Sequence, residues 1–217
     1  MALKEGAWSE TALITISKYA SSGTPSSLEL AALTETIDID LGDKDIDQIV
    51  NLKGGRLVKK TPQALTTITF EGYPVEVGPS VEETDTSETL KGISQLFSGG
   101  TWDTTQPITT EASRTRDLFR IAILWTDDTS ATSAAGSTSA TSHAYRIVFA
   151  HAYMTSMKPS FTDGILKFTF SFKVPAFNKN GVAQIREESS DGTVSLPALN
   201  PYNATYYDPD ETSSFDW

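Results

Sequence analysis

The segment from residue 144 to residue 174 most narrows what this chain can fold into. Two runs that alternate between apolar and polar side chains flank the dipeptide Asp163-Gly164. Asp-Gly between such runs is typical of a type I′ turn, because that turn needs positive φ at both central positions. The sequence therefore predicts a β-hairpin in which Thr162 pairs with Ile165.

The two strands of this hairpin agree on which face is buried. Counted from the turn, the register pairs Met157 with Phe170, Thr155 with Phe172 and Tyr153 with Val174, on a face that also holds Phe149, His151, Phe161 and Phe168. The opposite face is small, hydroxylated or basic: Ala150, Ala152, Met154, Ser156, Lys158, Ser160, Lys167, Thr169, Ser171 and Lys173. A slip of one residue would invert one strand, so the agreement supports the register. Pro159 lacks an N–H and predicts a sheet edge or a bulge.

Further alternating segments predict a mainly β protein. They are residues 11–19 with Ala12, Ile14 and Ile16 inward, 34–42 with Ile37, Ile39 and Leu41 inward, 64–77 with Ile68 and Phe70 on one face, and 116–125 with Phe119, Ile121, Ile123 and Trp125 on one face. A glycine turn and a short basic strand occupy 53–60. In 64–77 the apolar positions change parity at Gly72, which predicts a bulge or bend there.

Three segments do not read as strands. Residues 85–100 predict one flanking helix, with a capping box at its start and two glycines at its end. Residues 129–142 consist only of Ser, Thr, Ala and Gly. This composition predicts a long flexible loop. The acidic, aromatic stretch of about 189–217 predicts an extended C-terminal arm. We expect these parts to belong to one domain spanning 1–217.

Composition excludes several classes of function. The net charge of -11 disfavours tight binding of nucleic acid, since phosphate binding needs clustered Lys and Arg. No cysteine is present, which removes disulfides and thiolate chemistry. The first ten residues lack the apolar core of a signal peptide, so nothing argues for secretion. No run reaches transmembrane length, and we expect no membrane insertion.

No catalytic, cofactor or metal site is expected. His143 and His151 are the only histidines, and no cysteine could complete a zinc site with them. Residues 43–48 open like a calcium loop but lack its glycine and its bidentate acid, and are interpreted as a solvated acidic turn. No phosphate loop or Ser-His-acid arrangement is found. We therefore expect a protein that is not an enzyme.

The order of these features resembles that of the major tail tube proteins of long-tailed viruses. The resemblance rests on the runs DIDQIVNLKGGRLVKKTPQALTTITFEGYPVEV and FKVPAFNKNGVAQIREESSDG and covers about residues 34–191. It implies a β-sandwich or barrel-forming tail tube fold with one flanking helix and long loops. It also implies rings, commonly of six subunits, stacked into the tube of a virion tail that is assembled in the host cytoplasm and delivers the genome.

The resemblance implies partners as well. They would be other copies of the chain, a tape measure protein, a tail terminator and tail tip or baseplate proteins, with viral DNA passing through without tight binding. Asp38 and Asp40 are the candidate acids facing the lumen. The candidate subunit-contact residues are Arg56, Lys59, Lys60, Lys167 and Lys173, and the acidic segments 82–88 and 208–216 are their natural complements.

Three alternatives stay open at the level of sequence. The chain could be the inner tube of a contractile injection system, which would carry protein cargo. It could be a virion decoration or adhesion domain that folds alone, or a weak sugar-binding module. Ring formation separates the tubes from the domains that act alone.

Overall fold

The predicted mainly β class is confirmed. The computed structural model describes residues 11–23, 25, 27–33, 36–50, 52–60, 62–74, 117–162 and 165–207. Its strands are β1 (Thr11–Lys18), β2 (Ser27–Leu33), β3 (Asp38–Asp40), β4 (Ile46–Val50), β5 (Arg56–Lys60), β6 (Thr66–Pro74), β7 (Phe119–Thr126), β8 (His143–Thr162), β9 (Ile165–Val174) and β10 (Ile185–Asp191). The helix predicted over 85–100 lies outside the described residues.

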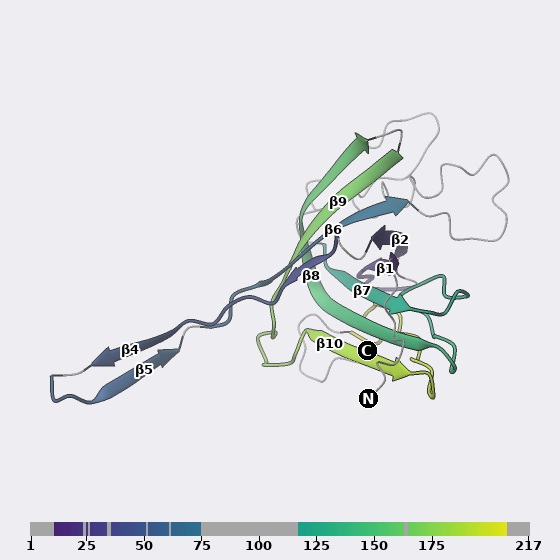
Figure 1. The fold of residues 1–217 in the computed structure, drawn as a ribbon. Helices are drawn as coiled ribbons and strands as arrows, with labels where there is room; N and C mark the ends of the chain where they lie inside the picture. Colours follow the sequence, from purple (N-terminus) through teal and green to yellow (C-terminus); the bar gives the residue numbers. More distant parts are fainter. Residues whose placement is uncertain are drawn as a thin grey trace, which may run out of the picture.

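Six strands form a closed antiparallel sheet (Figure 1). β1 pairs with β2, β2 with β6, β6 with β9, β9 with β8, β8 with β7, and β7 again with β1. β3 is added to β6 and β10 to β8. Among the described strands, β4 and β5 pair only with each other. Closure leaves edges only at the two added strands and at the parts of the ring strands that run beyond their neighbours.

The predicted register of the late hairpin is confirmed near its turn. Thr162 pairs with Ile165 and Met157 with Phe170. Pro159 lies in the half of β8 that pairs with β9 alone, which is the edge position that its missing N–H predicts. The local turn chemistry therefore determines the pairing over the first several residues on each side.

Further from the turn the predicted register is wrong, because β8 contains a β-bulge. Thr155 is an extra residue there, so that Met154 pairs with Phe172 and Tyr153 with Lys173. Met154 packs against the core, whereas Thr155 and Tyr153 are exposed. The predicted pairings of Thr155 and Tyr153, and their place on the aromatic face, are thereby overturned.

β8 contains a second bulge nearer its start. Phe119 pairs with Ala152 while Ile121 pairs with Phe149, and His151 adopts a φ of 57°. Bulges bend a strand and increase its twist. They accompany the change of partner along this 20-residue strand, which pairs with β7 and β10 in its first half and with β9 in its second.

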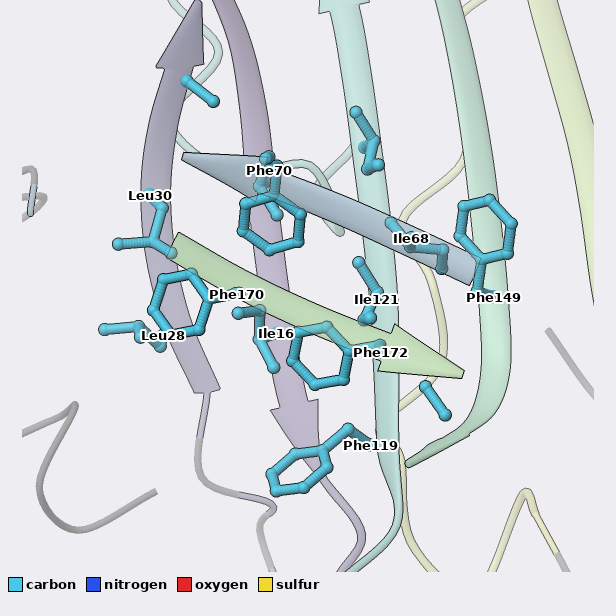
Figure 2. Packing of buried hydrophobic residues seen from close by; sticks show 14 of the residues in the cluster. Ile16, Leu28, Leu30, Ile68, Phe70, Phe119, Ile121, Phe149, Phe170 and Phe172 are labelled. Atoms are coloured by element: carbon cyan, nitrogen blue, oxygen red, sulfur yellow. The ribbon is translucent and has the colours of Figure 1, made fainter. Parts of the chain in front are cut away.

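Apolar side chains fill the interior of the closed sheet. Figure 2 shows Phe70, Phe170 and Phe172 facing side chains from the strands that lie across from them. The residues of this interior cluster that are at most 1% exposed are Ala12, Ile14, Ile16, Leu30, Ala32, Ile68, Phe70, Phe119, Ile121, Ile123, Phe149, Ala152, Phe170, Phe172 and Val174. The inward faces predicted for 11–19 and 116–125 are confirmed, with Trp125 packed at the margin of this core.

The predicted strand 34–42 is shorter than expected. Of its described residues, only Asp38–Asp40 pair with β6, and Ile37 and Ile39 pack against the core as predicted. Leu41, predicted inward, is 48% exposed. The chain leaves the sheet at this point, so the period-two pattern no longer determines burial.

The predicted bulge at Gly72 is not present. β6 pairs with β9 without a register shift from Thr66 to Gly72. A Cβ at Gly72 would lie 3.0 Å from Cδ1 of Leu30 on β2. The close approach of β2, which pairs with β6 just beyond this residue, therefore explains why position 72 is a glycine.

Residues 129–142 pack against the outer face of the closed sheet instead of lacking anything to bury. Ala134 and Thr138 are buried. The Ala134 N–H donates to Oγ1 of Thr15 at 2.9 Å, and the Leu196 N–H donates to Oγ1 of Thr138 at 2.9 Å. These contacts give the segment buried partners in the folded chain, and its flexibility stays a prediction.

The described part of the C-terminal arm lies on the same closed sheet. Residues up to Asp191 belong to β10, and Tyr202 and Tyr207 are buried against Ala150. Nη1 of Arg120 donates to the backbone carbonyl of Asn200 at 2.6 Å. Two aromatic residues of the described arm, Tyr202 and Tyr207, are thus buried within the chain, whereas Tyr206 is exposed.

Candidate assembly surface

The β4–β5 hairpin extends away from the closed sheet (Figure 1). Two extended segments connect it to the sheet, one from β3 to β4 and one from β5 to β6. Its strands pair from Ile46 with Lys60 to Val50 with Arg56. Gly54 supplies a φ of 78° in the turn. The interpretation of residues 43–48 as a solvated acidic turn is therefore wrong for its second half, which belongs to β4.

Both faces of this hairpin expose apolar side chains. Residues directly opposite in an antiparallel pair share a face, so Ile46, Val50 and Val58 lie on one side, and Ile49 and Leu57 on the other. Their exposed fractions are 62%, 66%, 54%, 51% and 60% in that order. An isolated two-stranded hairpin is at best marginally stable in water. This hairpin therefore has the composition of a segment that is covered by another surface.

The hairpin is also basic on an acidic protein. Arg56, Lys59 and Lys60 are exposed on β5, with Lys53 in the turn, against the single acid Asp47 within residues 46–60. The whole chain has a net charge of -11. A locally basic projection on an acidic body favours contact with an acidic surface, including that of another copy.

The structure separates the five predicted contact residues. Arg56, Lys59 and Lys60 lie together on β5, whereas Lys167 and Lys173 lie on β9 of the closed sheet. Nζ of Lys167 forms an ion pair with Oε2 of Glu71 at 2.8 Å within the chain. The intermolecular role proposed for Lys167 is therefore less well supported than that of the hairpin cations.

The two predicted lumen-facing acids lie on β3, the strand that is added to β6 at the edge of the closed sheet. Asp38 and Asp40 are exposed on β3. Oδ1 of Asp40 accepts a hydrogen bond from the Gly42 N–H at 2.9 Å, where the chain turns toward the hairpin. Their place in a lumen stays a prediction.

Sequence reasoning missed the apolar part of this surface. A signal was nevertheless present, because IDQIV and RLVKK carry apolar residues at both parities. A strand that is apolar at both parities is typical of burial on both faces. The pattern was obscured by the flanking charges, which favoured a solvated interpretation.

Neutral hydroxyl partners surround His151 at the second bulge. The Tyr207 hydroxyl lies 2.6 Å from Nδ1 of His151 and 3.3 Å from Oε1 of Gln184. Nε2 of His151 lies 2.8 Å from the Tyr153 hydroxyl. This arrangement ties the C-terminal segment to β8. Among the described residues, no group of three or more His, Asp or Glu side chains could hold a metal ion.

This cluster predicts a pH-dependent stability. Burial lowers the pKa of His151 below its ordinary value of 6.5. As the pH falls, the unfolded chain therefore binds a proton at this histidine before the folded chain does. Folding stability that is present above the pKa of the unfolded state is lost as the pH falls below that pKa. Between about pH 7.5 and about pH 5.5, the wild type should lose more unfolding free energy than His151→Asn, which keeps a residue tolerant of positive φ. Equal losses in urea titrations would contradict this.

No described helix is long and apolar enough to cross a membrane. No protein-family model matches the sequence, and no curated protein matches it either.

Three solved structures with low sequence identity are similar to the chain. A chain of the sheath–tube complex of PVC, an extracellular contractile injection system in the extended state, matches with 14% identity, 81% of this chain, 88% of that chain and a TM-score of 0.35. A chain of the anti-feeding prophage baseplate matches with 11% identity, 86% and 97% coverage and a TM-score of 0.39. An Hcp protein matches with 9% identity, 85% and 98% coverage and a TM-score of 0.35.

Proposed function

We propose that this chain is a structural subunit that assembles with copies of itself into stacked rings forming a tail-type tube. One observation carries the proposal: the projecting β4–β5 hairpin exposes apolar side chains on both faces. Contiguous exposed apolar surface marks a contact site. The resemblance to major tail tube proteins, which includes this hairpin sequence, supports the same conclusion.

The proposed tube would be a conduit for a genome, with rings commonly of six subunits. The net charge of -11 supports this use, since an acidic wall repels phosphate and does not retain DNA. The proposal needs no cofactor or catalysis. A tape measure protein, a tail terminator and a tip or baseplate are the further partners that the resemblance implies.

Self-assembly of the purified chain tests the proposal. Light scattering and negative-stain electron microscopy across protein concentration and salt should show rings or tubes. Moderate salt should promote assembly by screening the repulsion between acidic subunits, because the Debye length falls to about 8 Å at physiological ionic strength. A decoration, adhesion or sugar-binding domain would stay monomeric under all these conditions, and that result would overturn the proposal.

Removing apolar contact from the hairpin should abolish assembly without unfolding the subunit. In the variant Ile49→Ser with Leu57→Ser, we expect the unfolding free energy of the closed sheet to change by less than about 0.5 kcal/mol, since both side chains are exposed and remote from its core. Size-exclusion chromatography should show only monomer. Phe177→Ser, which changes an apolar side chain that is 55% exposed outside the hairpin, is the matched control and should still assemble.

A further inference from the structure

β10 offers an edge onto which another strand could be added. It is the terminal strand of its sheet within the described residues and pairs on one side with β8. An edge strand presents unpaired backbone groups that can accept a further strand. One of its faces exposes Glu187, Ser189 and Asp191. The other face carries Glu188, which accepts a hydrogen bond from Arg146.

The charges on this edge are opposite in sign to those on β5 and have the same spacing. Glu187 and Asp191 lie four residues apart on one face of β10, and Arg56 and Lys60 lie four residues apart on one face of β5. All four side chains are exposed. Glu187 binds the Tyr145 hydroxyl, and Oδ1 of Asp191 accepts from the Thr193 hydroxyl at 2.6 Å.

The geometry points to an intermolecular strand addition: β5 of one copy pairs antiparallel with the outer edge of β10 in a second copy. In the register proposed, Arg56 lies opposite Asp191, Val58 opposite Ser189 and Lys60 opposite Glu187. Opposite charges at directly opposed positions stabilise an antiparallel pair. This inference rests on the proposed function and adds the acceptor surface to it.

The other acidic edge fits the hairpin less well. β3 has three residues, and its acids Asp38 and Asp40 are two positions apart, so they cannot both oppose Arg56 and Lys60. The β10 of the same copy is also not the acceptor, because the hairpin extends away from the closed sheet to which β10 belongs (Figure 1). A second copy is therefore the occupant that the arrangement supports.

The contact would be heterologous, since each copy gives a hairpin and receives one on a different surface. Heterologous contacts close into rings or grow as filaments, depending on the rotation between copies. This pair of surfaces therefore supplies either the closure of a ring or the repetition along the axis, and a stacked tube needs a second contact as well.

Charge reversal and mixing test the inference on the purified full chain. R56E/K60E reverses the hairpin, and E187K/D191K reverses the edge. Each variant alone should need at least about tenfold more protein than the wild type to assemble, since like charges now oppose each other. An equimolar mixture should assemble near the wild-type concentration, because the acidic hairpin of one variant meets the basic edge of the other. D38K/D40K, on β3, is the control and should not restore assembly when mixed with R56E/K60E.

The outcomes separate this inference from the proposed function. Restoration in the mixture supports the β5–β10 contact and also shows that both variants are folded. If the wild type assembles but the edge variant assembles equally well, or if the mixture fails to assemble, the contact is overturned and the tube proposal stands. Rescue by D38K/D40K would overturn it in favour of β3. A wild type that never assembles would overturn the proposed function and this inference together.

Discussion

Replacing Arg146 with alanine is expected to lower the unfolding free energy by about 3–5 kcal/mol, because it removes the buried cation that contacts Glu188 and leaves only the partly exposed Arg186 beside that carboxylate. The side chain of Arg146 is fully buried, and its Nε donates to Oε2 of Glu188 at 2.8 Å. Nη2 makes a second contact with the same oxygen. The two residues lie opposite each other on β8 and β10.

The same guanidinium also joins the two segments that cover the sheet. Nη1 donates to the carbonyl oxygen of Ala134 at 3.2 Å and to that of Gly136 at 2.9 Å. Nη2 donates to the carbonyl oxygen of Pro197 at 2.7 Å. Truncation would leave these acceptors without their donor, which adds to the cost. We expect the loop and the C-terminal segment to become accessible to protease in this variant.

Arg186→Ala is the matched control for Arg146→Ala. Nη2 of Arg186 contacts the other carboxylate oxygen of Glu188 at 2.6 Å, but its side chain is 41% exposed. Its loss should cost no more than about 1 kcal/mol, as for other exposed ion pairs. Urea denaturation followed by circular dichroism would compare the two. Similar small losses in both variants would show that Arg146 does not hold the covering segments in place.

Phe170→Ala should cost about 3–5 kcal/mol, because it opens a cavity in the interior of the closed sheet. Phe170 is 0% exposed, and its ring centroid lies 5.3 Å from that of Phe70 and 6.4 Å from that of Phe172. These rings come from β6 and β9, which lie side by side (Figure 2). The neighbouring backbone is held by both strands and cannot collapse far into the space.

Ser171→Ala tests the same strand on its other face. Its hydroxyl lies 3.3 Å from Oγ1 of Thr69 in a partly exposed position, so removal should cost less than about 1 kcal/mol. Both variants can be measured by urea denaturation. Equal destabilisation would contradict the assignment of the aromatic face to the core.

The sequence alone determined the class of the fold and the pairing near the Asp163-Gly164 turn. Both depend on interactions between residues close in the chain: the turn conformation and the alternation of neighbouring side chains. The sequence also identified Arg56, Lys59 and Lys60 as candidate contact residues, because a cluster of like charges is visible in the order of the residues. The apolar side chains beside them, Ile49 and Leu57 for example, could not be identified as exposed from the sequence, since exposure depends on where the rest of the chain lies.

Only the tertiary structure decided where β8 changes its partners and what the low-complexity loop binds. The bulges at His151 and Thr155 accompany the strand's passage from β7 to β9, and no local pattern encodes which strands close the sheet. Likewise, the N–H of Ala134 binds Thr15, which is 119 positions away in sequence. Such a contact joins a backbone N–H to a buried side chain from a distant part of the chain, and the two meet only once the sheet has closed. For this reason, a segment without large apolar side chains can still pack against the sheet.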